Sequence, residues 1–249
     1  MTYSLNTQTR TLVIVGAGGL GTEFAWVAEE MNAAAERNGS ARQPWQILGY
    51  SDDAPEKRGK QLGRYLVHGT IKEIAEKFAG QNVAFAVAVG DNYTRETLAR
   101  AAEAAGWCPA TLVHPSVILA DDARIGAGTY IAPGCVVCPR AQVGNHVIIN
   151  THVSLGHDSV LEDYSQICPG ARISGGCRIG KQAFLGSNAS LTPGVAVGYG
   201  AVVGANSHAV RTVRPGLTVV GCPARAVCGP DRRAPKEIVS VGIGDQRHG

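Results

Sequence analysis

The chain has 249 residues and a formal net charge of +3; 17% of its residues are charged, 6% are aromatic and 32 are glycine. This composition excludes a disordered chain, which combines high charge with low hydrophobicity, and disfavours a helix bundle, in which so much glycine is costly. The small net charge and the lack of a run of Lys and Arg argue against nucleic acid as a partner.

The N-terminal segment MTYSLNTQTR is polar, and no apolar run approaches the length of a membrane span. The seven cysteines are an odd number without a visible export signal, so we expect reduced thiols in the cytoplasm. Cys135 and Cys138 have CxxC spacing, but no second pair follows to complete a zinc site. We therefore expect a cytoplasmic protein without a membrane contact or a bound metal.

The first part of the chain alternates strand-like and helix-like segments. Strands are expected at residues 11–15, 45–50 and 83–90, and helices at residues 22–37 and 94–105. A βαβ rhythm of this kind predicts a small parallel sheet with helices on its faces. We expect a Rossmann-like α/β domain over residues 1–110.

A six-residue repeat follows. Counting in sixes from Val113 to Val203 meets only Val, Ile or Leu, and the residue four places after each is small or β-branched. A unit with one large and one small inward residue suits one side of a triangular coil, and three units close a turn. The repeat predicts a left-handed parallel β-helix over residues 111–228, with glycines at corners of positive φ. Residues 229–249 are left as a C-terminal tail without an assigned role.

Four segments occur together with this repeat: GAGGLG after the first strand, GDNYTR at residues 90–95, LVHP at residues 112–115 and GCPA at residues 221–224. In this combination the sequence resembles the nucleotide-sugar N-acetyltransferases of bacterial glycan synthesis and their sialic acid O-acetyltransferase relatives, over roughly residues 11–227. The resemblance implies a homotrimer that binds acetyl-CoA between neighbouring β-helices.

The stretch INTHVSLGHDSV contains the candidate catalytic residues. His157 is the third residue of its repeat unit, so its side chain is expected to point outward, and Gly175 and Gly176 follow one turn later. Adjacent coils lie about 4.8 Å apart, which would leave room for a thioester beside the ring. A histidine is suited to remove a proton from an attacking amine, and Asp158 can hold the ring in one tautomer.

The resemblance agrees with this interpretation. It places the catalytic histidine and its acidic neighbour on His157 and Asp158, and a supporting asparagine on Asn150. Gln166 and Leu20 stand where the family often has histidines, and a glutamine can donate a hydrogen bond but cannot titrate. The expected contacts with acetyl-CoA are Gln166, Gly175, Gly176, Gly186, Ser187 and Pro223.

The GxGxxG segment lies between a strand and a helix, where a phosphate can approach backbone N–H groups. The sheet is too short for a full dinucleotide fold, so a mononucleotide is the better ligand. The resemblance implies a UDP-sugar, with the acidic pair at the end of the second strand near the uridine. The expected contacts are Gly16, Gly18, Gly19, Gly21, Asp52, Asp53, Gly90, Asn92 and Arg95. A packing domain without a ligand is the alternative.

The leading hypothesis is acetyl transfer from acetyl-CoA to the amino group of a UDP-linked amino sugar, with direct attack and His157 as general base. Alternatives are O-acetylation of a sialic acid or related sugar, and a non-catalytic protein that binds nucleotide sugars. A zinc lyase of the same fold is a third alternative, because His152 and His157 have His-x4-His spacing. His114 and His146 are the earlier candidates for a third ligand, but neither stacks over this pair.

Overall fold

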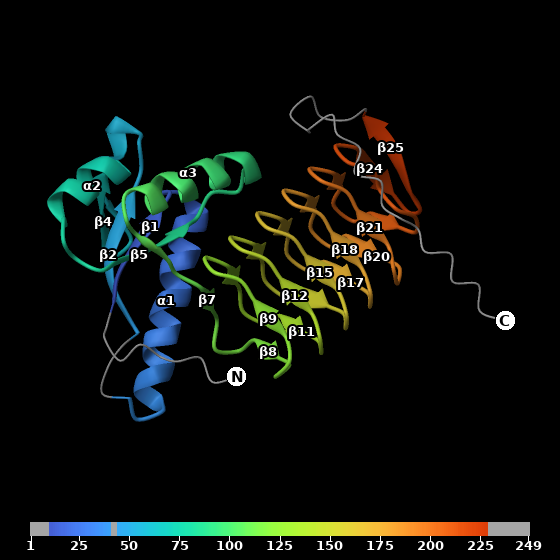
Figure 1. The fold of residues 1–249 in the computed structure, drawn as a ribbon, viewed down its shortest axis with the longest axis horizontal. Coiled ribbons are helices and arrows are strands. Elements are labelled where there is room, and N and C mark those ends of the chain that lie inside the picture. Colours follow the sequence, from blue (N-terminus) through green and yellow to red (C-terminus); the bar gives the residue numbers. More distant parts are fainter. Residues whose placement is uncertain (1–9, 41–43, 229–249) are drawn as a thin grey trace.

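The computed structural model describes residues 10–40 and 44–228; the predicted tail lies outside this part of the chain. An α/β domain comes first, a stack of β-coils follows, and a hairpin ends the stack (Figure 1). Among the described residues, no helix has the length and apolar character needed to cross a membrane.

The N-terminal sheet has the strand order β3-β4-β2-β1-β5-β6, and all neighbours except β3 and β4 are parallel. Its strands are β1 (Arg10–Val15), β2 (Trp45–Ser51), β3 (Gln61–Leu62), β4 (Tyr65–Gly69), β5 (Val83–Val87) and β6 (Cys108–Pro109). The helical segments are α1 (Gly19–Arg37), the short 3₁₀ turn η1 (Pro55–Lys57), α2 (Ile71–Lys77) and α3 (Asn92–Ala104).

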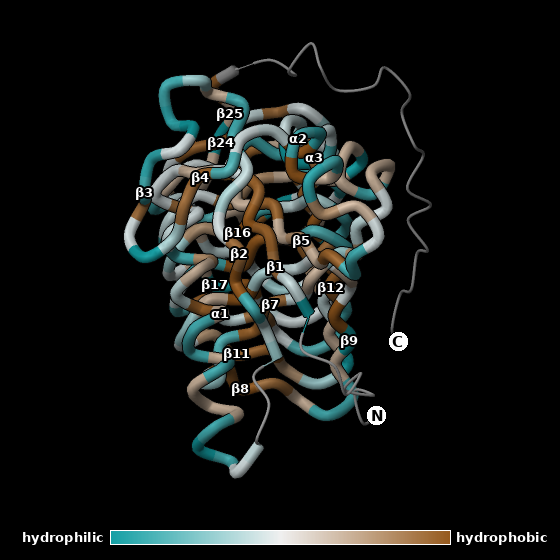
Figure 2. The backbone as a smooth tube through the Cα atoms, turned by 90° about the vertical axis from the view of Figure 1, so that its left-hand side faces the viewer, coloured by the Kyte–Doolittle hydropathy of each residue, from teal (hydrophilic) through white to brown (hydrophobic). Residues whose placement is uncertain are grey.

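The central strand β1 is apolar along most of its length (Figure 2). Because side chains alternate across a strand, Leu12 and Ile14 pack towards α1, whereas Val13 and Val15 pack towards α2 and α3. The sheet therefore has helices on both faces, as the βαβ rhythm predicts. The elements β3, β4 and α2 were not predicted from the sequence.

The coils form three faces of stacked parallel strands. Face 1 contains β7 (Leu112–Val113), β10 (Tyr130–Ile131), β13 (Ile148–Ile149), β16 (Gln166–Ile167), β19 (Phe184–Leu185) and β22 (Val202–Val203), and the hairpin β24 (Thr218–Gly221) and β25 (Ala224–Cys228) extends it. Face 2 contains β8 (Ile118–Leu119), β11 (Val136–Val137), β14 (Ser154–Leu155), β17 (Arg172–Ile173), β20 (Ser190–Leu191) and β23 (His208–Ala209). Face 3 contains β9 (Arg124–Ile125), β12 (Gln142–Val143), β15 (Val160–Leu161), β18 (Arg178–Ile179) and β21 (Ala196–Val197).

The predicted aliphatic positions are the second residue of each coil strand from β7 to β22, and most of them belong to one buried core. Strand pairs join residues one turn apart, as Ile131 pairs with Val113 on one side and with Ile149 on the other. The repeat continues one unit beyond the prediction, because β23 places Ala209 in the same core.

The corners of the coils also follow the six-residue period. Every sixth residue from 128 to 206 has a φ between +52° and +74°. Glycine occupies only some of these corners, and Arg140, His146, His152 and Asp158 are among the other residues found there. A left-handed conformation is unfavourable for residues with a Cβ, so the stacked coils must stabilise these corners.

The N-terminal domain is docked on face 1. Phe24 of α1 stacks on Tyr130 with ring centroids 3.9 Å apart and an angle of 6° between the rings. Leu112 and Ile148, the neighbouring outward residues of this face, are also buried in this contact. Helix α1 therefore packs on the sheet with one side and on the β-helix with the other.

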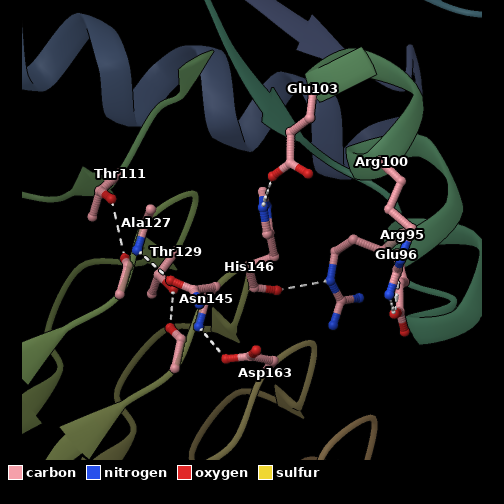
Figure 3. Close-up of polar contacts among 12 residues, drawn as sticks. Arg95, Glu96, Arg100, Glu103, Thr111, Ala127, Thr129, Asn145, His146 and Asp163 are labelled. Atoms are coloured by element: carbon pink, nitrogen blue, oxygen red, sulfur yellow. Dashed lines mark hydrogen bonds and ion pairs between the residues drawn. The ribbon is translucent and has the colours of Figure 1, made fainter. Parts of the chain in front are cut away.

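A buried arginine joins α3 to the coils (Figure 3). The guanidinium of Arg95, which is 1% exposed, donates to the carbonyl oxygens of His146 at 3.0 Å and Tyr164 at 2.6 Å. It also donates to Asn92 Oδ1, while Asn92 Nδ2 donates to the carbonyl of Gln182 at 2.8 Å. Burial lowers the pKa of Arg95 to about 10, so the group is still protonated at neutral pH.

Candidate active site

His157 and Asp158 lie on the edge between faces 2 and 3, where the chain turns from β14 to β15. His157 Nδ1 lies 2.7 Å from Asp158 Oδ2, and the His157 side chain is 65% exposed. Arg140, one turn earlier on the same edge, donates from Nε to Asp158 Oδ1 at 2.6 Å and from a terminal nitrogen to Oδ2 at 2.9 Å. The carboxylate thus joins a guanidinium to an imidazole.

The charges in this group determine the tautomer of the ring. Hydrogen bonds from Arg140 and His157 hold the pKa of Asp158 well below its usual range. An ionised carboxylate can only accept hydrogen bonds, so the proton shared with His157 belongs to Nδ1. In the neutral form of the ring, the other nitrogen, Nε2, carries the lone pair at an exposed edge, as a general base requires.

Gly175 seats the ring of His157. A Cβ added at Gly175 would lie 2.5 Å from both Cε1 and Nε2 of the imidazole. We expected the glycine to leave space for a thioester; the structure instead places the ring itself over this residue. Gly176 is a corner residue with a φ of +69° and open space around it.

The supporting Asn150 and three of the predicted acetyl-CoA contacts lie on the edge between faces 1 and 2 or in the hairpin that extends face 1. Asn150 is buried at the edge between faces 1 and 2, and its Nδ2 donates to the carbonyl of Ile167 at 3.1 Å. Within residues 10–40 and 44–228, no hydrogen bond connects Asn150 with His157. Gly186 and Ser187 follow two turns later on that edge, and Ser187 is exposed. Pro223 is exposed in the turn between β24 and β25.

Gln166 is separated from His157. It is the outward residue of β16 on face 1, opposite the edge that carries His157. The Gln166 side chain is 9% exposed and lies beside Gly90 and Arg95. A single chain therefore does not bring Gln166 and His157 into one site.

The glycine loop has two kinds of glycine. Gly16 has a φ of +110°, and a Cβ at Gly21 would lie 2.3 Å from the carbonyl oxygen of Gly16, so these two shape the turn. Gly18 and Gly19 are exposed with open space around them. Helix α1 begins at Gly19 without a side-chain cap, so its first N–H groups are available to an anion.

The two predicted aspartates have different positions. Asp52 braces the loop, because its Oδ2 accepts from the backbone of Ala17 at 2.9 Å and from Lys57 Nζ at 2.8 Å. Burial alone would raise the pKa of Asp52, but these bonds and one from Ala54 lower it. Asp53 is exposed and lines a hollow between α2 and α3.

The side chains of Asn92 and Arg95 lie in the contact between α3 and the coils. Both are buried, and their donors are used in the contact between α3 and the coils described above. A contact of these two side chains with the sugar stays a prediction. Gly90 is exposed near Gln166, and Leu20 is half-buried against the core around α1.

The histidines are dispersed. His152 is exposed, with its ring over Gly134, whereas His146 is buried and stacks on Tyr164 with ring centroids 5.2 Å apart. Within the described part of the chain, no group of three or more His, Cys, Asp or Glu side chains is arranged to hold a metal ion.

Comparisons with known proteins agree with this fold. Residues 11–102 match the family model of the PglD N-terminal domain, and residues 176–208 match the hexapeptide repeat of succinyl-transferase. The acetyltransferase domain of PglB from Neisseria gonorrhoeae, in complex with acetyl coenzyme A, is 32% identical with a TM-score of 0.76. This match covers 88% of the present chain and 100% of that chain. The chain belongs to the hexapeptide-repeat sugar N-acetyltransferase family.

Two further structures have the same fold. The perosamine N-acetyltransferase PerB from Caulobacter crescentus, in complex with CoA and GDP-perosamine, is 26% identical with a TM-score of 0.77, and the match covers 88% of this chain and 97% of that one. WeeI from Acinetobacter baumannii is 24% identical with a TM-score of 0.76 over 88% of this chain and 100% of that one. The predicted fold class is confirmed, and the protein is an acyltransferase.

Arg140 was missed in the sequence. It lies 18 residues before Asp158, so the six-residue repeat places both at the same corner of successive coils. Counting one turn back from Asp158 would have found it. Lys57 was also missed, and no sequence period links it to Asp52.

Proposed function

We propose that this acyltransferase moves the acetyl group of acetyl-CoA to the amino group of a nucleotide-linked amino sugar, with UDP as the nucleotide. One observation carries the proposal: the ionised Asp158 keeps the proton on Nδ1 of His157 and leaves Nε2 free at an exposed edge. The open glycine loop with the uncapped start of α1 supports a diphosphate ligand in the same chain.

In the proposed reaction, the amine nitrogen attacks the thioester carbonyl carbon. The new C–N bond forms, the C–S bond breaks, and CoA leaves as a thiol. Nε2 of His157 takes the proton that the nitrogen must lose, and the imidazolium can return it to the leaving sulfur. Asp158 stabilises the imidazolium while the ring carries this proton.

We further propose that residues 1–110 hold the nucleotide sugar, that residues 111–228 hold acetyl-CoA, and that the protein works in the cytoplasm as a homotrimer. The positions of the two proposed substrate sites, the glycine loop and the edge with His157, support the trimer. The glycine loop lies on the domain that covers face 1, whereas His157 lies on the opposite edge. A neighbouring subunit can bring its loop to this edge. Light scattering tests the assembly, and an active monomer would contradict it.

The reaction is tested with a panel of UDP- and GDP-linked sugars, each as an amino sugar and as its hydroxyl counterpart. We expect release of the CoA thiol and an acetylated product with the UDP-amino sugars, and neither with the hydroxyl sugars. Preference for GDP-amino sugars would overturn the choice of nucleotide. Transfer only to a sialic acid hydroxyl would replace the proposed reaction with O-acetylation. Binding of both substrates without turnover would indicate a non-catalytic binding protein.

A further inference from the structure

We propose that Arg140 is a positioning residue for acetyl transfer, which acts by holding Asp158 in the orientation that fixes the His157 ring. This inference rests on the proposed function, in which His157 is the general base. Both oxygens of Asp158 accept from Arg140, at 2.6 Å and 2.9 Å, and Oδ2 also accepts from His157 Nδ1 at 2.7 Å. A forked pair of this kind fixes the plane of a carboxylate, which a single contact does not.

The backbone explains how the three groups meet. Arg140 and Asp158 occupy equivalent corners of successive coils, with φ values of +59° and +61°. The backbone N–H of Arg140 donates to Asp122 Oδ1 at 3.0 Å, so the corner is held independently of the guanidinium. A substitution of the Arg140 side chain should therefore leave the coil intact. Exposed ion pairs contribute little to stability, so the effect is expected in catalysis.

The charges near the ring determine the expected pH dependence. Arg140 lies one coil before His157, and Asp122 lies one coil before Arg140. The coil after His157 places only uncharged residues at this edge: Ser174, Gly175 and Gly176. Without the guanidinium, the charge of Asp158 is uncompensated beside the ring. An uncompensated carboxylate favours the imidazolium, so the ring keeps its proton to a higher pH.

The test compares Arg140→Gln, which removes the charge, with Arg140→Lys, which keeps the charge but not the fork. For Arg140→Gln we expect the acid limb of kcat/KM and the NMR signals of the His157 ring to respond at a higher pH than in the parent. The kcat should fall roughly 10-fold, the lower end of the cost of removing a group that orients a metal-bound histidine. Arg140→Lys should lose kcat but keep the parent titration, and both variants should melt near the parent temperature.

Arg178→Gln is the matched control, because it removes the same charge from another ion pair between coils, with Glu162. It should leave the titration of His157 and kcat close to those of the parent. A parent-like titration and kcat in Arg140→Gln, or an equal change in Arg178→Gln, would overturn the inference. An NMR shift in Arg140→Gln together with full activity of His157→Ala would instead overturn the proposed function and leave the orienting contact standing.

Discussion

At the scale of single residues, the missing side chain of Gly175 determines where the His157 ring lies. A methyl group there would lie 2.5 Å from the imidazole, closer than real contacts allow. In Gly175→Ala the exposed ring can turn into solvent, so we expect little change in melting temperature. The ring would leave the position that it needs for proton transfer, and kcat should fall by roughly 10-fold or more.

Thiol-release kinetics and a melting curve check this prediction together. Ser174→Ala is the control, because it changes the preceding residue without adding an atom beside the ring. The affinity for the nucleotide sugar should be unchanged in Gly175→Ala. A parent-like kcat in Gly175→Ala would show that the seat of the ring is unimportant.

His146 should make the stability of the protein depend on pH. Burial lowers the pKa of His146, although Glu103 at 3.4 Å acts in the opposite direction. The folded protein then keeps the ring neutral at pH values where the unfolded chain, with a pKa of about 6.5, is protonated. Unfolding takes up a proton in this window, so stability falls as the pH drops below about 7.

The melting temperature should therefore fall between about pH 7 and pH 5, and fall less steeply in His146→Asn. Asparagine tolerates the φ of +52° at this corner, although it loses the stacking of the imidazole on Tyr164. The slope with pH is the readout, since the variant is expected to be less stable at every pH. An equal slope in both proteins would exclude His146 as the cause.

At the scale of elements, the contact between α3 and the coils depends on Arg95. Arg95→Met keeps an apolar stem but removes the donors to the carbonyls of His146 and Tyr164. A buried polar group without a partner costs about 1–3 kcal/mol, so we expect a loss of several kcal/mol in the free energy of unfolding. Arg100→Met, which removes an exposed ion pair with Glu96 on the same helix, should cost about 1 kcal/mol or less.

Urea denaturation measures both variants. Equal destabilisation by the two substitutions would mean that the buried hydrogen bonds of Arg95 do not hold the domains together.

The elements also show what the sequence can predict. The coils follow from a local period in which each unit repeats one backbone shape, so the strand positions could be counted along the chain. Docking of the domains has no such period. The segment with Asn92 and Arg95 resembles a sugar-binding loop, and no local pattern predicts that Arg95 also donates to His146, 51 residues away. The pair of His157 and Asp158 was visible because the two are adjacent, whereas Arg140 is adjacent only across a turn.

At the scale of the whole molecule, the two substrates should bind to separate parts of the protein. A substitution in one part should therefore weaken the binding of one substrate and leave the binding of the other intact. Among the described residues other than its chain neighbours, no atom lies within 4 Å of a Cβ added at Gly18, so Gly18→Val should fold normally. Its side chain would occupy the space through which a phosphate approaches the start of α1. We expect a raised KM for the nucleotide sugar and nearly unchanged binding of acetyl-CoA.

Calorimetry with each ligand alone separates these effects. If Gly18→Val lost acetyl-CoA binding while nucleotides never bound the parent, the N-terminal domain would not be a substrate domain. The protein would then remain an acyltransferase whose acceptor is unknown.

The central claim is that His157 removes the proton from the attacking amine. It is tested most directly by the kcat of His157→Ala, measured as thiol release at saturating concentrations of acetyl-CoA and the best amino sugar of the panel. We predict a fall of roughly 10²- to 10⁴-fold, the usual contribution of a general base, with little change in stability because the side chain is exposed. Asp158→Asn should cost less, because the carboxylate orients the ring without taking the proton. Full activity of His157→Ala would contradict the account.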